Sequence, residues 1–379
     1  MENPYFHRKR GELASSGEWK CFYDPDGVEY SIGDVFKIVG ESAVFTSLTF
    51  KNFRALEDCE LPLGRITVLV GPNGSGKSTV LLGLRMIQEG LGHLDPSDLL
   101  SASKSMTKSN IQFEIKLNWK VENQEAAVRV LWSRSNGNSW SGESPRVRTS
   151  NMDPIFFEEH FLKRMEIFSF DENRISEHVP LKPNSDIAND GSGLAGHLDW
   201  LRDHHPEQFE ALNAELPQWV PEFDRILFDV PQDGCRSINL RTRVGHHSIP
   251  AKSLSSGTLI ALVFLSLIHN PTPPPLIAIE EPDRGIHPRL LRRIQDAIYR
   301  LAYPAGDRAP VQVICTTHSP YFLDLFSEHP EEIVIAEKTD AGTKFTLLSE
   351  KPNIQEILEG APLGDIWFSG ILGGVPTES

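Results

Sequence analysis

The chain has 379 residues, of which 39% are hydrophobic and 23% are charged, as in a globular protein with one large or two medium domains. Its formal net charge of −15 disfavours a general electrostatic grip on nucleic acid. The four cysteines lack zinc or redox spacing, no apolar run is long enough to span a bilayer, and the N-terminus has no apolar signal-peptide core. These features predict a soluble, cytoplasmic protein with no membrane partner.

Residues 1–42 precede the main body of the chain. Two short runs of strand-forming residues, Trp19–Tyr23 and Val28–Tyr30, flank the turn sequence Asp24-Pro25-Asp26-Gly27. We expect residues 1–42 to form a small appended β element.

A glycine-rich loop follows the apolar run Ile66–Val70, which predicts a buried strand, and precedes Val80–Ile87, which predicts a helix. The loop fits the phosphate-binding pattern of Gly, four residues, then Gly-Lys-Ser/Thr. The alternative, a glycine turn without a ligand, does not account for the complete pattern in the right context. The expected nucleotide contacts are Gly71, Pro72, Asn73, Gly74, Ser75, Gly76, Lys77, Ser78 and Thr79.

The residue types of this loop suit a nucleoside triphosphate. Glycines let backbone N–H groups curl around phosphates, and the start of the following helix adds its positive dipole end. We expect Lys77 to reach the β- and γ-phosphates and the Ser78 hydroxyl to bind Mg²⁺. ATP and Mg²⁺ are therefore the predicted ligands.

Residues 43–151 are expected to form a first lobe around this loop. Alternating apolar residues over 111–119 and 128–132 predict an antiparallel strand pair, and residues 136–151 predict a loop. Residues 152–250 are expected to form a compact helical insertion, because Leu194, Leu198 and Leu201 recur at helical spacing. The sequence shows no sustained heptad repeat, so we expect no coiled-coil arm.

Two acidic residues follow the apolar run Leu276–Ile279 in the second lobe, residues 251–379. Ligand sites of open α/β sheets lie at the carboxyl ends of such strands. We assign Glu280 to the metal and Glu281 to general-base catalysis. The alternative is an acidic strand-to-helix turn with Asp283 as a helix cap, which the phosphate loop upstream makes the weaker interpretation.

Two further segments complete the predicted site. His318 follows the apolar strand Val311–Cys315, where its ring would contact a γ-phosphate or orient water, although a lone histidine is more often structural. Ser255, Ser256 and Gly257 begin the apolar helix ending at Ile268, where exposed backbone N–H groups suit an anion. The catalytic assignments are therefore Lys77, Glu281 and His318.

In their order, these motifs resemble those of the ABC-type ATPase heads of the RecF, SMC and OLD families. The resemblance is closest to compact OLD-related ATPases without the Toprim nuclease domain, through Leu254–Thr258, Glu280–Pro288 and Thr316–Pro320. It implies an α/β phosphate-loop NTPase fold of the ABC type, with a mixed sheet, an antiparallel β lobe and the helical insertion. It also implies a homodimer in which Ser255–Gly257 completes the partner's ATP site.

The sequence departs from the resembling families at several positions. Glu280 replaces the usual Asp at the metal position, and Ser256 and Thr258 differ from the Gly and Gln of transporter signatures. The glutamine loop is not evident, and residues 170–173 are a weak candidate for it. The sequence after Leu348 contains no acidic triad of the nuclease domain of full OLD proteins.

The leading functional hypothesis is an ATPase whose ATP-dependent dimerisation, or higher assembly, controls a separate effector such as a nuclease. The resemblance suggests a subunit of a bacterial anti-phage defence system, with any contact to nucleic acid being indirect. Two alternatives remain open at this point. One is a RecF-like DNA-repair or chromosome-maintenance ATPase that binds DNA, and the other is a scaffold that binds ATP with little turnover.

Overall fold

The computed structural model describes residues 11–13, 19–23, 29–31, 43–89, 111–121, 124–134, 140–148, 157–180, 186–230, 234–339 and 342–373. At the N-terminal end, strands β1 (Gly11–Leu13), β2 (Trp19–Tyr23) and β3 (Glu29–Ser31) form an antiparallel sheet. The predicted pairing around residues 24–28 is thus confirmed, although those turn residues lie outside the described residues.

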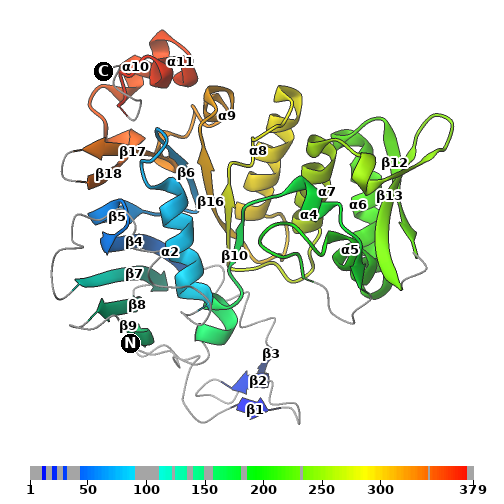
Figure 1. Ribbon diagram of the computed structural model, residues 1–379, viewed down its shortest axis with the longest axis horizontal. Helices are drawn as coiled ribbons and strands as arrows, with labels where there is room; N and C mark the ends of the chain where they lie inside the picture. Colours follow the sequence, from blue (N-terminus) through cyan, green and yellow to red (C-terminus); the bar gives the residue numbers. More distant parts are fainter. Residues whose placement is uncertain are drawn as a thin grey trace.

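A six-stranded sheet forms the centre of the molecule (Figure 1). Its order is β10 (Glu166–Phe168), β15 (Leu276–Glu280), β16 (Gln312–Thr317), β6 (Ile66–Val70), β17 (Ile333–Thr339) and β18 (Gly342–Leu347). The first five strands are parallel, and β18 is antiparallel to β17. Because successive side chains of a strand point to opposite faces, Val68 and Leu69 enter two different cores.

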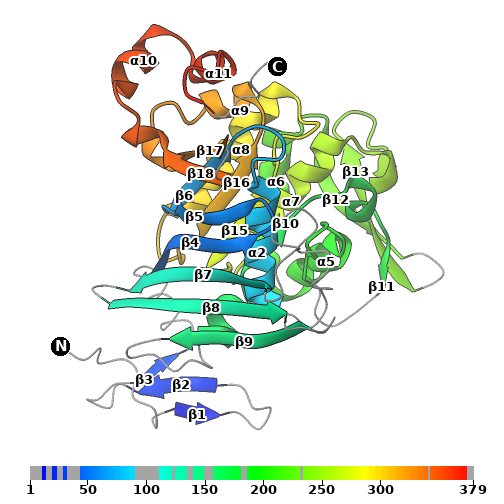
Figure 2. The same cartoon turned by 60° about the vertical axis from the view of Figure 1, so that its left-hand side comes forward.

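On one face of this sheet lie helix α2 (Lys77–Glu89) and a five-stranded antiparallel sheet (Figure 2). That sheet has the order β5 (Leu56–Pro62), β4 (Ala43–Phe53), β7 (Ile111–Val121), β8 (Gln124–Arg134) and β9 (Trp140–Arg148). The predicted pairing of residues 111–119 with 128–132 is confirmed. The loop expected over 136–151 is wrong, because β9 pairs with β8 across 140–148.

Helix α2 and β4 approach each other closely at Gly83. A Cβ atom at Gly83 would lie 2.6 Å from Cε1 of Phe50. Phe50 is completely buried and stacks on Phe53, with 5.8 Å between the ring centroids. The glycine therefore sets how near the helix that follows the phosphate loop lies to the antiparallel sheet.

The opposite face of the central sheet is covered by helices α7 (Ser256–Ile268) and α8 (Pro288–Ala302). Every residue of α7 from Thr258 to Ile268 is buried, since α6 and α8 pack against it in addition to the core of the central sheet. α8 is amphipathic, with Leu290, Leu291 and Ile294 facing the core.

The segment 152–250 is not wholly helical, which corrects the expected helical insertion. Helices α5 (Leu194–His204) and α6 (Pro206–Trp219) are present and pack on an antiparallel sheet. This sheet contains β11 (Val179–Pro180), β13 (Cys235–Thr242), β12 (Phe223–Asp229) and β14 (Ser248–Pro250). In addition, β10 of this segment is an edge strand of the central sheet. Residues 186–250 form the insertion lobe.

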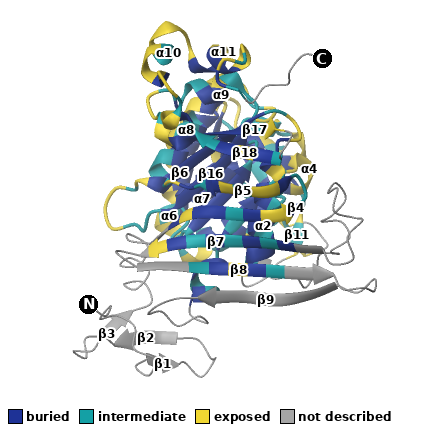
Figure 3. Ribbon diagram, turned by 90° about the vertical axis from the view of Figure 1, so that its left-hand side faces the viewer, coloured by how far each residue is buried: buried dark blue, intermediate teal, exposed yellow. Residues whose placement is uncertain are grey.

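The C-terminal helices α10 (Ile354–Gly360) and α11 (Leu363–Phe368) lie near α9 (Pro320–Asp324). Figure 3 shows the strands of the central sheet buried and much of α10 exposed. Of the two aromatic residues at the end of α11, Trp367 packs on the fold, with 5% exposure, whereas Phe368 is 76% exposed. Among the described residues, no helix is both long and apolar enough to cross a membrane.

Candidate functional site

Three predicted motifs meet at one edge of the central sheet. The phosphate loop follows β6, Glu280 and Glu281 stand at the end of β15, and His318 follows β16. These three strands are parallel neighbours in the order β15-β16-β6. Their carboxyl ends therefore lie together, as expected for a ligand site in an open α/β sheet.

The phosphate loop has a backbone that requires glycine at several positions. Gly74 and Gly76 have φ values of 76° and 95°, in the region that side chains disfavour. A Cβ atom at Gly71 would lie 2.4 Å from the carbonyl oxygen of Ala336. From β18, the Thr343 hydroxyl donates to the Ser75 carbonyl at 3.0 Å. The loop is thereby fixed against β17 and β18.

Lys77 begins α2 and turns back over the loop. Its Nζ donates to the carbonyl oxygens of Gly71 and Pro72, each at 2.9 Å, and the residue is 5% exposed. Burial lowers the pKa of Lys77 to about 8, while the charges of Glu281 and Glu280 act in the opposite direction. The ammonium group is thus held on the loop, and anionic oxygens arriving there would favour its charged form.

The first turn of α2 carries the remaining loop residues. Ser78 is exposed and Thr79 is half-buried. Asn73 and Gly74 are also exposed, whereas the Ser75 hydroxyl is enclosed and has no hydrogen-bond partner among the described residues. The free N–H groups at the helix start and the accessible Ser78 hydroxyl fit a phosphate and its metal ion.

Glu281 has an unusual backbone conformation for a residue other than glycine, with φ of 46°. Its N–H donates to the carbonyl oxygen of Thr316 at 3.1 Å and lies 3.2 Å from the Thr316 hydroxyl oxygen. Such backbone strain persists only where the surroundings hold it. Here β16 holds it and sets the direction in which the side chain leaves the end of β15.

The carboxylate of Glu281 lies beside His318, with 3.4 Å between Oε1 and Nε2. Burial and the charge of Lys77 lower the pKa of His318, although Glu281 and a contact with Gly71 act in the other direction. The lowered pKa favours the neutral form of the imidazole. A carboxylate and a neutral imidazole side by side can orient and polarise water.

Asp283 stands two residues beyond Glu281 and is partly enclosed. Burial raises the pKa of Asp283 to about 6, against a hydrogen bond from Thr317, and the charge of Glu281 raises it further. The chain then turns at Gly285, whose φ is 70°, before α8 begins at Pro288.

Ser255, Ser256 and Gly257, the signature segment, stand at the start of α7. Ser255 is the N-cap, and its hydroxyl accepts from the Thr258 N–H at 3.2 Å. Within the part of the chain that the structure describes, no hydrogen bond or ion pair joins the signature segment to the phosphate loop, Glu280, Glu281 or His318. The structure thus brings three of the four predicted motifs together and leaves the fourth apart.

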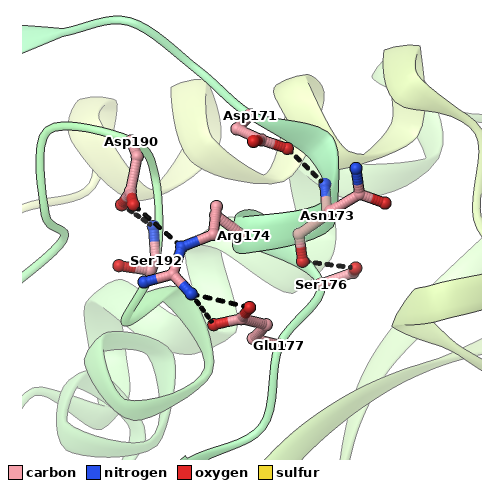
Figure 4. Close-up of polar contacts among 7 residues, drawn as sticks. All are labelled: Asp171, Asn173, Arg174, Ser176, Glu177, Asp190 and Ser192. Carbon is pink, nitrogen blue, oxygen red and sulfur yellow. Dashed lines mark hydrogen bonds and ion pairs between the residues drawn. The ribbon is translucent and has the colours of Figure 1, made fainter.

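Residues 170–173, which follow β10, lie at the edge of the site, a position that the sequence indicated only weakly. Because β10 is parallel to β15, this segment leaves the same edge of the sheet beside Glu280. Asp171 caps helix α4 (Glu172–Ile175), accepting from the Asn173 N–H at 2.9 Å (Figure 4). With only three residues, β10 has too little periodicity to be recognised from sequence.

Arg174 fixes the segment that follows β10. It pairs with Glu177 at 2.7 Å and with Asp190 at 3.0 Å, as Figure 4 shows. Burial would raise the pKa of Asp190, but hydrogen bonds from Ser192 and Arg174 outweigh it and lower the pKa to about 2. The turn at the edge of the site is therefore held by hydrogen bonds and charge.

The fold and the phosphate loop beside an acidic strand end define a phosphate-loop NTPase of the ABC-ATPase type. The chain belongs to the family described as "AAA domain, putative AbiEii toxin, Type IV TA system", whose model matches residues 66–324. It is an ABC-type ATPase of the RecF, SMC and OLD kind.

Individual relatives agree with this class. The chain is 25% identical over 327 residues to an OLD nuclease of Thermus scotoductus, covering 73% of this chain and 59% of that protein. A segment of 61 residues is 43% identical to the sulfate/thiosulfate import ATP-binding protein CysA of Nocardia farcinica, covering 16% of this chain and 17% of that protein. The match to this chain thus covers less than two thirds of the length of each of these relatives.

Two solved structures share the fold. One is an Smc head bound to the C-winged helix domain of ScpA, with a TM-score of 0.55 and 16% identity, covering 80% of this chain and 96% of that one. The other is an Smc head domain with coiled coil and joint derived from Pyrococcus yayanosii, with a TM-score of 0.50 and 11% identity, covering 84% and 99%. At these identities the likeness concerns the fold.

Proposed function

We propose that this protein binds and hydrolyses ATP, and that ATP pairs two copies head to tail to control an effector protein. The observation that carries the proposal is the pairing of Glu281 with His318 beside Lys77, at the edge where the phosphate loop ends. A scaffold that only holds ATP does not need a strained carboxylate facing a neutral imidazole.

Each residue of the edge takes a role that its surroundings support. The loop N–H groups and Lys77 bind the β- and γ-phosphates, and Ser78 and Glu280 hold Mg²⁺. When bound, the metal neutralises negative charge on the phosphates. Glu281 takes a proton from the attacking water, and His318 orients that water or contacts the γ-phosphate.

The position of the signature segment supports pairing in trans. Among the described residues, the Ser256 and Gly257 N–H groups in the first turn of α7 have no hydrogen-bond partner, and the segment lies apart from the loop of the same chain. In a head-to-tail pair, the segment of one copy would complete the γ-phosphate site of the other, so that hydrolysis depends on pairing. The homodimer is therefore part of the proposed mechanism.

The effector and the biological setting are the finer part of the proposal. The family description names a toxin of a type IV toxin–antitoxin system, and one relative is an OLD nuclease. These names support a cytoplasmic ATPase of a bacterial anti-phage defence system with a separate nuclease or other effector.

Solution mass, measured by light scattering with and without ATP and Mg²⁺, tests the pairing. We expect ATP to double the mass of the wild type transiently and of Glu281→Gln persistently, because the amide cannot accept the proton from water. Lys77→Ala should stay at the unpaired mass. An equal mass for all three proteins in both conditions would contradict ATP-dependent pairing.

A further inference from the structure

A cavity of about 490 Å³ lies between the insertion lobe and the core, away from the phosphate loop. It is lined by the end of α6 and the residues after it, by the start of α7 and by the first turns of α8. Its volume is in the range of small-molecule sites.

Two arginines give one wall of the cavity its charge. Arg289 and Arg293 line it and are one helical turn apart on α8. Among the described residues neither guanidinium makes an ion pair or a hydrogen bond, whereas Arg300, further along α8, is paired with Glu215 at 2.5 Å. Two cations are thus available to a ligand.

Two helix starts face the same cavity. Ser255 and His287, the N-caps of α7 and α8, both line it. These helices have 13 and 15 residues, long enough for a full N-terminal dipole. Together with the two guanidinium groups, they make this wall suited to a phosphate group.

The rest of the lining has a different chemistry. Trp219, Val220 and Leu290 supply apolar surface, and Glu222 and Gln218 supply hydrogen-bonding groups. An apolar wall suits a nucleobase, and a carboxylate suits the hydroxyl groups of a sugar or an exocyclic amine. The chain's net charge of −15 and the concave shape favour a small ligand over a polynucleotide.

We propose that this cavity binds a nucleoside phosphate at a second site, separate from the phosphate loop. Arg289 and Arg293 hold the phosphate, and the wall around Trp219 and Glu222 holds the nucleoside. The site exists within one chain and does not depend on pairing. Because it shares Ser255 and Gly257 with the signature segment, its ligand would act on the helix that pairing uses.

Calorimetric titration of the full-length Lys77→Ala chain tests the site, since this variant lacks the main phosphate contact of the ATP site. The probes are the four ribonucleoside 5′-monophosphates and inorganic pyrophosphate. We expect at least one monophosphate to bind once per chain and pyrophosphate to compete with it. Adding Arg289→Ala or Arg293→Ala should weaken binding about tenfold, the loss expected for a charged hydrogen bond.

Arg292→Ala is the matched control, because Arg292 is exposed on the same helix and does not line the cavity; its effect should be under about twofold, within the small changes usual for such surface substitutions. If Arg293→Ala lowers the unfolding midpoint, the exposed Arg289 carries the test alone. Absence of binding up to about 10 mM probe, well above the millimolar affinities of weak sites, would overturn the proposal.

Two further results would also overturn it. One is binding that the double arginine variant leaves unchanged. The other is a single-stranded oligonucleotide binding more tightly than every monophosphate, with a steep dependence on salt. Wild-type ATP turnover, measured in parallel without the probes, reports separately on the proposed ATPase, so failure of one proposal does not imply failure of the other.

Discussion

At the scale of single residues, the site depends on how Glu281 is held. Its left-handed backbone is fixed by Thr316, and its carboxylate lies 3.4 Å from His318. The strain is a cost to folding that the neighbouring strand offsets. Its consequence is a carboxylate that lies beside His318, which is the arrangement on which the proposed base role of Glu281 rests.

Glu281→Gln tests this role directly. The amide keeps the shape but cannot accept a proton, so turnover of ATP should fall by about a hundredfold or more. Binding of ATP, measured by equilibrium titration, should change little, because Lys77 and the loop are untouched. Turnover within a few-fold of wild type would show that another group acts as the base.

Glu166 is the residue whose ionisation should limit stability. Burial raises its pKa from 4.5 to about 8, the charge of Asp186 raises it further, and Arg164 opposes the shift. A carboxyl group with a raised pKa in the folded state stabilises the fold fully below pH 4.5. That contribution is lost as the pH rises through 8.

Glu166→Gln cannot ionise and should therefore escape this loss. At pH 8 we expect the variant to be more stable than wild type by about 2 kcal/mol or more, with little difference at pH 4. Thermal unfolding at both pH values measures this, with the exposed Glu350→Gln as control. A difference that does not grow with pH would contradict the assignment.

At the scale of elements, the sequence predicts the strands and helices that have a clear local periodicity or adjoin a motif. The strands that lead to the phosphate loop, Glu281 and His318 are apolar and buried on both faces, and all three were recognised. β9 was missed because Ser, Gly and Pro dilute its pattern, although β8 supplies the pairing partner. β10 and the sheet of the insertion lobe form through long-range contacts that local pattern does not contain.

The candidate site was predictable to a similar extent. Motif identity and order placed Lys77, Glu281 and His318 correctly at the ends of their elements. The strained φ of Glu281 and its contact with Thr316 depend on neighbouring strands, so no local pattern reveals them. The cavity beside Arg289 likewise arises where the end of α6 meets the starts of α7 and α8, a contact that no local pattern contains.

Gly83→Ala tests the packing of α2 against β4. Alanine favours a helix by about 1 kcal/mol over glycine, but here its Cβ would overlap Phe50. We expect a net loss of about 1–3 kcal/mol in unfolding free energy, as for overpacked cores. Gly360→Ala is the control, since a Cβ there has open space. Denaturant titration should show the loss only at Gly83.

At the scale of the whole molecule, the signature segment lies apart from the phosphate loop of its own chain. This separation is why we propose that two copies pair head to tail. Ser256→Glu introduces a negative charge where the partner's γ-phosphate would lie. An acidic residue in the first helical turn is otherwise favourable, so the fold should be kept. Gln208→Glu, in the first turn of α6, is the matched control and should retain turnover.

Complementation between two inactive variants tests pairing in trans most directly. In a mixed pair of Lys77→Ala and Ser256→Glu chains, one composite site has an intact loop from one chain and an intact signature from the other. We predict that mixing equal amounts restores ATP turnover to between about a quarter of wild type, for random pairing, and about a half, if only mixed pairs form, because each mixed pair has one complete site of two. A mixture as inactive as its components would contradict the head-to-tail sandwich.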